Sequence, residues 1–578
     1  MTTLSDHSHL HNTSSPNSPT VTTHTFDNSD LHDDISAPSK SGLKKPNDSD
    51  TTTVAVPTAE QPPGVNAGPV APATGQPVNI ESTPVEDDPR QWSRHRKLVI
   101  LAIISFAALA PTTGAFIYQP AIQLVERDLH ATTSEIALSL SLFILVQGNA
   151  PLAWSSISEI KGRRFVYIIA MIIFIVGSAV GGASKQMPVL ICMRMLQAAG
   201  SSAVLSLGAG TLADIYAPHE RGSMLGIYYA APLLGPSLGP VVGGALSQAW
   251  SWRATFYFLT IIGVVVLISM FMFRDTFRQE RSLTYQSAKR HAIRRAEAKL
   301  AQSGSVDAME KATQIRVDPS TIRVTLVDLN PFKPIWNILR RKNNLAILLP
   351  SALLFAFQYS ICFTAARTFA AAPYHYDPLK IGLILLSFGF GNMCGSVLGG
   401  RWSDHTFAKL KEKNNGQGWP EMRLNSTKPV MIILPPTILA FAWTCQKHTH
   451  IAGPVVSLFF AGFAVLFIYS STLAYVVDAN AGRSTAAVAS NSSARGISGL
   501  IAAEIAAPIQ DAIGDGGLYS IWAGLVIVME LMILLVIWRG KRWREEAERQ
   551  EQAGQTISGS ATPIGPNSRL VAKVKSHC

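Results

Sequence analysis

The chain has 578 residues, of which 47% are hydrophobic and only 15% are charged, whereas soluble proteins carry about a quarter charged residues. Its net charge of +11 does not indicate nucleic-acid binding, because the lysines and arginines lie beside apolar segments and on one side of them. The five cysteines have no CxxC or Cys/His spacing, so we expect no disulfide framework, no metal site and no cofactor.

The first ninety-six residues are rich in serine, threonine, proline, aspartate and histidine and poor in large apolar side chains. Such a segment cannot bury enough apolar surface to offset its ordering entropy, so we predict that residues 1–96 form a disordered tail. Two interpretations of the tail stay open. It is a solvated tether, or a segment for phosphorylation and turnover with Lys40, Lys44 and Lys45 as candidate modification sites.

The rest of the chain alternates long apolar runs with short polar segments. A bilayer core of roughly 30 Å requires about 20 apolar residues per helix. Twelve runs meet this requirement, six before and six after a long polar gap: 98–118, 136–156, 165–184, 188–212, 222–246, 254–273, 345–366, 380–401, 429–446, 453–477, 486–509 and 517–538. The sequence therefore predicts an all-helical integral membrane protein with two six-helix bundles, over 97–273 and 344–538.

Positive charge sets the expected orientation. The loops after the second, fourth and eighth runs, the central loop 274–343 and the C-terminal tail 539–578 carry the basic residues, whereas the alternate loops are nearly free of them. By the positive-inside rule both termini are cytoplasmic, and we expect the plasma membrane as the location. Within the central loop, Tyr285–Leu300 is typical of a basic helix on anionic lipid, and a solvated linker is the alternative.

The two bundles are related by an internal repeat. The fourth run ends in Leu212-Ala213-Asp214 and the tenth in Val476-Val477-Asp478. Likewise, Ser155-x-x-x-Glu159 after the second run matches Gly400-x-x-x-Asp404 after the eighth. Parallel repeats of this kind enclose a central substrate site in secondary transporters.

The fifth run contains the most specific pattern, which consists of Gly226, Gly235, Gly239-Pro240 and Gly243-Gly244. Gly235, Gly239 and Gly243 are four residues apart and share one helix face, where missing side chains let a neighbouring helix approach closely. Ordinary packing is the alternative reading of such a face. The full spacing resembles, position for position, the antiporter motif of major facilitator drug–proton exporters, in which it is typical of antiporters rather than symporters.

The fourth run carries Arg194-x-x-Gln197. An arginine inside a span costs roughly 3 kcal/mol or more and therefore usually faces a cavity or a partner. The alternative is that Arg194 reaches the nearby membrane interface. The exporter family has Arg and Gln at this spacing, and the resemblance implies proton coupling by Arg194 and Gln197; the family's Gly after Gln is Ala198 here.

The loop after the second run reads Glu159-Ile160-Lys161-Gly162-Arg163-Arg164 and is similar to the family's loop motif, with Ser155 in place of Gly and Glu159 in place of Asp. We expect Glu159, Arg163, Arg164 and the helix-end Asp214 to form a cytoplasmic charge cluster that latches the two halves in one state. A role in topology signalling alone is the other interpretation.

Further patterns narrow the resemblance to the fungal quinidine-resistance subfamily of twelve-spanner drug–proton antiporters. These patterns are Trp252-Arg253-x-x-Phe256, Pro420-Glu421-x-Arg423-Leu424, Tyr475-x-x-Asp478 and Asn491-x-x-x-Arg495. The resemblance covers nearly all of the chain after residue 90. It implies export of drugs, weak organic acids or other amphiphilic metabolites.

The proton carrier and the substrate cavity are less sharply indicated. Glu504 lies inside the eleventh run, where apolar burial would favour protonation; the alternative is that this run ends earlier and leaves Glu504 at the interface. The family architecture places polar and aromatic residues in the cavity, and for each one helix packing is the alternative. These candidates are Gln147, Asn149, Tyr228, Tyr229, Gln358, Tyr359, Phe363, Asn392 and Tyr469.

We therefore expect a monomeric secondary transporter, not an enzyme, that exports small organic molecules in exchange for protons across the lipid bilayer by alternating access. No phosphate-binding loop or catalytic triad is found in the sequence. Two alternatives stay open: a facilitator or symporter of a specific metabolite, and a non-transporting receptor on the same fold.

Overall fold

A computed structural model of the chain describes residue 85 and residues 87–302, 332–480 and 483–560. The chain divides into the units Met1–Gln76 and Pro77–Cys578, and all described residues belong to the second. These residues form helices and connecting turns without a β-strand, which confirms the predicted all-helical class. Most of the predicted tail, and residues 303–331 of the central loop, lie outside the described residues.

The first half is built from α1 and α2, η3 and α3, and five longer helices. Their bounds are α1 Arg94–Ala107, α2 Leu109–Phe116, η3 Gln119–Ala121, α3 Ile122–Leu129, α4 Thr133–Lys161, α5 Arg163–Ala183, α6 Met187–Ile215, α7 Pro218–Ala249 and α8 Arg253–Met272. Pro111 lies inside α2 and has no amide hydrogen, and the helix of the first crossing is interrupted nearby, at Ala108. The predicted first run is therefore divided between two helices.

The second half follows η4 (Gln279–Arg281) and α9 (Leu283–Gln302), which contains the predicted basic helix. Its elements are α11 Phe332–Leu339, α12 Lys342–Ala370, α13 Pro378–Lys413, η5 Pro420–Thr427, α14 Lys428–Met431, α15 Leu434–Gln446, α16 Ala452–Asp478 and α17 Ser484–Ser560. The predicted ninth run is broken between α14 and α15, where the pair Pro435-Pro436 begins a new helix.

Among the described residues, eleven helical segments are long and apolar enough to cross a membrane. The last of them, Ser484–Glu551, has 68 residues, about 100 Å at 1.5 Å per residue, which is far more than one bilayer core. It is interrupted at Gly514, where the backbone is non-helical with φ of 70°. This segment contains the eleventh and twelfth predicted runs, and the protein is a multi-pass membrane protein.

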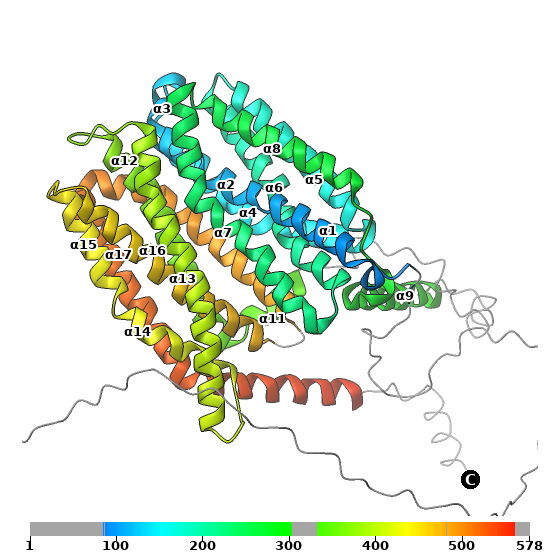
Figure 1. Cartoon of the computed structure of the whole chain (residues 1–578). Helices are drawn as coiled ribbons and strands as arrows, with labels where there is room; N and C mark the ends of the chain where they lie inside the picture. The colour runs from blue at the N-terminus through cyan, green and yellow to red at the C-terminus, as the bar shows by residue number, and fades with distance from the viewer. Residues whose placement is uncertain (1–84, 86, 303–331, 481–482, 561–578) are drawn as a thin grey trace, which may run out of the picture. The chain divides into compact units, whose positions relative to one another are not determined.

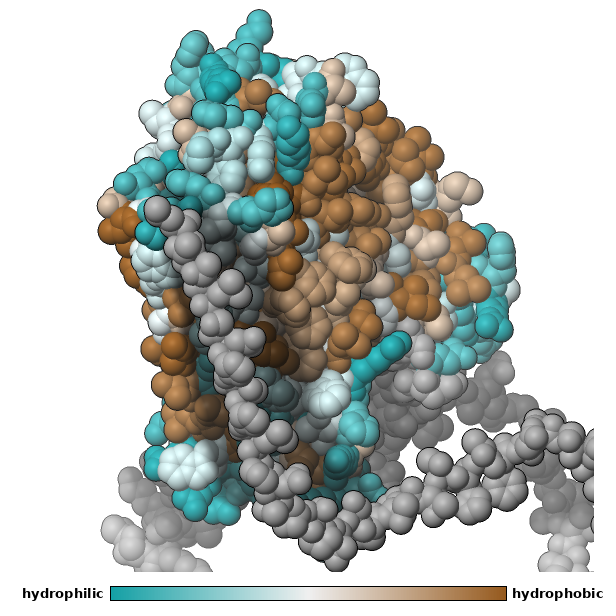
Figure 2. All heavy atoms as spheres, turned by 60° about the vertical axis from the view of Figure 1, so that its left-hand side comes forward, coloured by the Kyte–Doolittle hydropathy of each residue, from teal (hydrophilic) through white to brown (hydrophobic). Residues whose placement is uncertain are grey.

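The surface of the described part agrees with this assignment. Hydrophobic residues form a broad band across the middle, and hydrophilic residues gather at the two ends (Figure 2). Lipid offers no hydrogen-bond partners to the backbone, and helices satisfy their own amides and carbonyls. We call the end that carries the α4–α5 and α13–η5 connections, with Lys161 and Lys413, the basic end. The other is the opposite end.

Each half has its own packing, and two helix pairs join the halves. In the first half α5 packs against α6 and α8; in the second, α12 packs against α17 and α13 against α16. Between the halves, α4 packs against α17 and α7 against α13 (Figure 1). In the internal repeat, α4 of the first half corresponds to α13 of the second, and α7 corresponds to the first crossing of α17. The α4–α17 and α7–α13 contacts are therefore equivalent under the repeat.

Close backbone contacts between the halves run from the middle to the opposite end. A Cβ on Gly382 would lie 2.3 Å from the carbonyl oxygen of Pro240, and one on Gly148 would lie 2.8 Å from the Cα of Gly496. Toward the basic end, Gly226 on α7 and Gly400 on α13 face open space. At the opposite end, a buried apolar cluster that includes Phe256 and Phe363 draws on both halves.

Candidate functional site

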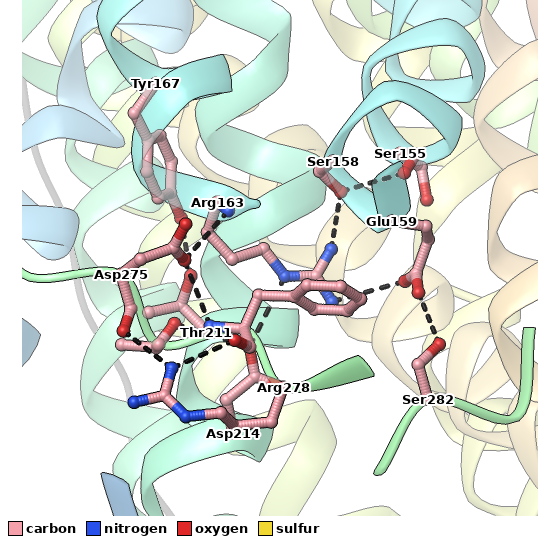
Figure 3. A network of polar contacts seen from close by, with 12 residues as sticks. Ser155, Ser158, Glu159, Arg163, Tyr167, Thr211, Asp214, Asp275, Arg278 and Ser282 are labelled. Atoms are coloured by element: carbon pink, nitrogen blue, oxygen red, sulfur yellow. Dashed lines mark hydrogen bonds and ion pairs between the residues drawn. The ribbon is translucent and has the colours of Figure 1, made fainter. Parts of the chain in front are cut away.

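The turn between α4 and α5 holds a charge cluster at the basic end (Figure 3). The guanidinium of Arg163 is buried. It pairs with Glu159 on α4 at 3.3 Å and with Asp214 at the end of α6 at 3.4 Å. Three of the four residues predicted for a charge cluster therefore meet, because α4, α5 and α6 all have an end here.

Several members of this cluster were missed by the sequence analysis. Arg163 also donates to the Ser158 hydroxyl at 2.5 Å, and Thr276 donates to Asp214 at 3.3 Å. Ser282 donates to the other oxygen of Glu159. The segment after α8 thus closes over the cluster. Asp275, an acidic residue just after the apolar run 254–273, was the sequence signal that could have placed this segment in the cluster.

Asp275 explains the glycine at the α4–α5 turn. Gly162 has a φ of 86°, and a Cβ there would lie 1.9 Å from a carboxylate oxygen of Asp275. The other oxygen of Asp275 accepts the backbone amides of Arg163 at 3.1 Å and Phe277 at 3.0 Å. This carboxylate therefore fastens the segment after α8 to the start of α5.

Two features differ from the predicted latch. Arg164 does not join the carboxylates; its guanidinium donates to the Phe271 carbonyl at 2.8 Å, because neighbouring residues on a helix point in different directions. The partners of Arg163 all lie in the first half and in the segment that follows α8. In this state the cluster braces the first half internally and does not bridge the halves.

The second half has a matching cluster. Arg423 in η5 pairs with Asp404 on α13 and with Asp478 at the end of α16. Asp404 and Asp478 are the repeat equivalents of Glu159 and Asp214, but the position four residues after Asp404 is Ala408. The arginine therefore comes from a different segment, and helix spacing alone could not identify it.

Arg194 on α6 is completely buried. The guanidinium carbon lies 4.7 Å from the ring centre of Tyr118 and 4.5 Å from that of Phe143. One nitrogen donates to the Gly114 carbonyl of α2 at 3.4 Å, whereas Nε and the second terminal nitrogen have no hydrogen-bond partner in the described part of the chain. The side chain thus points into the first half and not toward the membrane interface.

Gln197, one helical turn further along α6, is also buried. Its amide donates to the Ser178 hydroxyl at 2.9 Å, and its backbone lies against Gly177, where a Cβ would meet the Gln197 amide nitrogen at 2.6 Å. Gln197 therefore links α6 to α5. Its side-chain hydrogen bond goes to Ser178 and not to Arg194.

The glycines of α7 divide between two neighbours. A Cβ on Gly235 would lie 2.3 Å from the Thr112 hydroxyl, and one on Gly243 would lie 1.9 Å from the Ile117 carbonyl oxygen. Gly239 is less tightly packed, with 3.3 Å to the Phe116 Cβ. These three glycines face α2 and its C-terminal end, in the same half.

The next face of α7 meets the other half. A Cβ on Gly244 would lie 2.3 Å from the Pro378 carbonyl oxygen at the start of α13, and the Pro240 carbonyl is met by Gly382 of α13, as described above. Gly226 has no such neighbour. The helix that carries the predicted motif, α7, is therefore tightly packed on two sides toward the opposite end of the protein. Toward the basic end, at Gly226, it faces open space.

The short helix α2 links the two motifs. Arg194 of α6 donates to the Gly114 carbonyl of α2. On α7, Gly235 packs on Thr112 in the middle of α2, and Gly243 packs on Ile117 at its C-terminal end. The amide of Gln147 on α4 donates to the Pro111 carbonyl of α2 at 2.8 Å. A displacement of α2 would therefore change the contacts of α4, α6 and α7 together.

Two carboxylates lie within crossings of α17. Glu504 accepts a hydrogen bond from Ser141 on α4, so it lies at the contact between the halves. Glu530, for which no role was predicted, is 8% exposed, and among the described residues one of its carboxylate oxygens has no hydrogen-bond partner. The sequence signal for Glu530 was an acidic residue inside the apolar run 517–538.

Several predicted cavity residues lie in the interior of one half. Tyr228 is buried in the first half and donates to the Val204 carbonyl at 2.9 Å. Asn392 is 1% exposed between α13 and α16, and its amide has no partner. Gln358 is buried, Phe363 belongs to the cluster at the opposite end, and Gln147 is bonded to α2. Tyr229, in contrast, is 47% exposed.

Of the remaining candidates, Tyr469 contacts Arg495 on α17, and Tyr359 and Asn149 lie at contacts between the halves. Arg495 donates to the Tyr469 hydroxyl at 2.5 Å and lies 3.8 Å from the Phe355 ring centre. Tyr359 stacks on Phe116 of the first half at 5.3 Å. Asn149 of α4 accepts from Ser493 at 2.6 Å, beside the Gly148–Gly496 contact. Arg495 was singled out from the sequence only as part of the Asn491-x-x-x-Arg495 pattern, without a role in the site.

The segment before α1 is fastened to the segment after α8. Asp88 receives two hydrogen bonds of 2.7 Å from Arg281 and caps η2 (Pro89–Gln91) by accepting from the Arg90 amide. The Arg281 guanidinium, together with that amide, holds the pKa of Asp88 below its ordinary value of 3.8. The end of the predicted tail is therefore bound at the basic end.

A model of the Major Facilitator Superfamily matches residues 104–503. Among curated proteins, the chain is 28% identical to the MFS antiporter QDR3 of Candida albicans, over 83% of each chain. It is 29% identical to citrate exporter 1 of Aspergillus niger, over 83% of this chain and 93% of the relative. Quinidine resistance protein 3 of Saccharomyces cerevisiae is 24% identical, over 80% and 85%. The predicted resemblance to the quinidine-resistance subfamily is confirmed.

Solved structures give the same fold. A peptide transporter in complex with sulfate superposes with a TM-score of 0.55 at 14% identity, over 77% of this chain and 95% of its own. A D-xylose–proton symporter gives a TM-score of 0.54 at 14% identity, over 75% and 97%. At these identities the likeness extends to the fold alone.

Proposed function

Because this chain belongs to the Major Facilitator Superfamily, we propose that it exports small organic compounds in exchange for protons by alternating access. In this proposal the basic end is cytoplasmic, the protein lies in the plasma membrane, and it works as a monomer. The state described here is closed at the opposite end, where the halves meet, and would take up substrate from the cytoplasm.

The position of α2 carries the proposal. Arg194 contacts one side of this short helix through the Gly114 carbonyl, and the tightly packed glycines of α7 contact another side. An arginine side chain does not lose its proton in proteins, so Arg194 would act by holding α2 and not by carrying the proton. Movement of α2 would then link a protonation event to the α7–α13 contact between the halves.

The charge clusters support the same scheme. In each half one arginine joins two carboxylates on different helix ends. The first cluster is mostly buried, and paired buried charges are costly to separate. The second is more exposed, with the Asp404 side chain 72% exposed, and adds a further tie between helices. Each half would therefore move as a rigid body while the contacts between the halves change. Glu504 is the candidate proton carrier at that contact, because it accepts from Ser141 of the other half.

The test is transport by the purified full-length chain in liposomes, with quinidine and citrate as probe compounds. For molecules inserted with the basic end outward, an acidic vesicle interior should drive probe accumulation, and a dye inside should report proton efflux. Collapse of the gradient by an uncoupler should abolish accumulation. The matched control is the Gly243→Ala variant in the same membranes.

The other outcomes identify the alternatives. Probe equilibration that ignores the gradient and the uncoupler would mean facilitated diffusion. Accumulation that requires protons to move in the same direction as the probe would mean symport. If residues 1–90 were essential in cells while Arg194→Gln had no effect there, a receptor would replace the transporter.

A further inference from the structure

Arg495 is an intramembrane cation in the second half, and the described part of the chain supplies no acidic partner for it. It belongs to the first crossing of α17 and is partly exposed. Within the described residues no carboxylate forms an ion pair with it, and its nearest polar contact is the Tyr469 hydroxyl. Its Nε is buried without a hydrogen-bond partner. An unpaired guanidinium within a membrane is unfavourable, so its presence requires an explanation.

Aromatic rings stabilise the charge but leave its hydrogen-bond donors free. The guanidinium carbon lies 3.8 Å from the Phe355 ring centre and 4.7 Å from that of Tyr469. Cation–π contact uses the faces of the guanidinium plane, whereas its five N–H donors point outward in that plane. Such a fork can donate two parallel hydrogen bonds to the two oxygens of a carboxylate.

A row of packed aromatic rings begins beside this cation. Phe355 packs against Tyr359 with ring centres 4.7 Å apart, and Tyr359 stacks on Phe116 of α2 at 5.3 Å. The three rings lead from Arg495 in the second half to the first half. An apolar or aromatic body attached to the bound group could pack along these rings.

The site also lies where the halves separate. Gly496, the residue after Arg495, touches Gly148 of α4, and a Cβ on Gly496 would lie 3.3 Å from the Asn149 amide. Close contacts between the halves run from this level to the opposite end. A ligand at Arg495 would therefore lie beside the Gly148–Gly496 contact and touch both halves.

The nearest acid along α17 does not compete for Arg495. Glu504 follows nine residues later, about 13 Å along the helix axis, and it accepts from Ser141. A cationic ligand would meet Arg495 without a compensating carboxylate, whereas an anion would receive its unused donors. The charge of this site therefore favours anions.

On the basis of the proposed function, we infer that Arg495 binds the carboxylate of the exported compound, and that Phe355, Tyr359 and Phe116 contact its apolar body. The substrate class is thus small organic acids that carry an apolar or aromatic group. Asn491, one turn before Arg495, orients the site, because it donates to the Tyr469 hydroxyl at 3.3 Å and accepts from Ser351 at 2.7 Å.

The test is equilibrium binding to the purified full-length protein in detergent, which requires neither transport nor a proton gradient. The probes are benzoate, benzamide and benzylamine, which share a ring and differ in charge. Benzoate should bind best. Arg495→Gln should weaken benzoate binding roughly 10- to 100-fold, the range expected for hydrogen bonds to a charged group, and should leave benzamide binding unchanged.

Two further variants keep the test decisive. Arg495→Lys retains the charge without the planar fork, so it should keep the preference for benzoate over benzamide while binding benzoate more weakly. Arg539→Gln removes a positive charge that stacks on Trp538 beyond the last crossing, and it should bind benzoate like the wild type. Melting curves without ligand establish which variants are folded.

Two results would overturn the assignment: equal binding of benzoate and benzamide by the wild type, or undiminished benzoate binding by folded Arg495→Gln protein. Neither result bears on proton exchange, which the liposome experiment measures separately. Conversely, loss of proton coupling with intact benzoate binding at Arg495 would reject the proposed exchange and keep the anion site.

Discussion

Gly243 of α7 lies directly against the Ile117 carbonyl oxygen at the end of α2, so closely that a Cβ on Gly243 would be 1.9 Å from that oxygen. A backbone carbonyl cannot rotate away as a flexible side chain can, so even a methyl group would force the two helices apart. The tightest packing of the α7 motif is therefore at Gly243, and not at Gly239 in the middle of the pattern.

Gly243→Ala should reduce transport per surface molecule at least tenfold, because overpacking costs about 1–3 kcal/mol and the two states differ by only a few kcal/mol. Gly226→Ala is the matched control in the same helix, since Gly226 faces open space, and it should transport normally. Gly239→Ala should be intermediate. Normal transport by Gly243→Ala at normal surface expression would show that this face is ordinary packing.

Arg163 and its two carboxylates should behave as one unit. Arg163→Ala should destabilise the protein by about 3–5 kcal/mol, because it leaves two carboxylates without their partner. Asp214→Asn alone should destabilise it less, because Arg163 keeps its ion pair with Glu159. The double variant should lose much less than the sum of the two, which thermal unfolding in detergent and a double-mutant cycle would measure. Arg164→Ala, outside the cluster, should change stability little. Additive losses would contradict a single cluster.

Replacement of Arg194 by lysine should uncouple the protein. Lysine keeps the charge, but it cannot present a planar group to both the Tyr118 and the Phe143 rings while donating to the Gly114 carbonyl. We expect normal insertion, downhill movement of substrate, and loss of accumulation against a gradient, measured as protons moved per substrate in liposomes. Full coupling in Arg194→Lys would remove Arg194 from the mechanism.

Glu504→Gln should abolish proton-driven accumulation and leave exchange between equal pools of substrate intact. The amide cannot release a proton, but it can still accept from Ser141 across the contact between the halves. Glu530→Gln is the comparison, because Glu530 lies in the twelfth predicted run, and it should retain coupling. The reverse pattern, with coupling lost only in Glu530→Gln, would transfer the role of proton carrier to Glu530.

The Asp88–Arg281 ion pair should persist through neutral and mildly acidic pH. The pKa of Asp88 is lowered in the folded state, so the pair stabilises the fold fully above the ordinary value of 3.8. This stabilisation is lost as the pH falls through the lowered pKa. A spin label at position 91 should become mobile only in that acidic range, whereas in Arg281→Ala it should be mobile at pH 7. Mobility in the wild type at pH 6 would contradict the pairing.

The sequence by itself determined the helical class, the membership of the major facilitator family and the position of each motif along the chain. Hydropathy suffices for the helical class because lipid leaves the backbone little choice but to hydrogen-bond within each segment. Composition within about 20 residues therefore decides where a helix crosses. The cluster of Glu159, Arg163 and Asp214 was also within reach, because it joins the ends of consecutive helices.

Only the tertiary structure decided which face of each helix meets which neighbour. Arg164 leaves the cluster, Tyr228 is buried within one half, and the arginine of the second cluster comes from η5. Each outcome depends on the rotation of a helix about its axis and on partners many residues away. In a membrane, moreover, apolar faces meet lipid and protein equally well, so hydrophobicity does not distinguish them. The side chains that share the surroundings of Arg495 come from α12, α16 and α17, and packing alone brings them together.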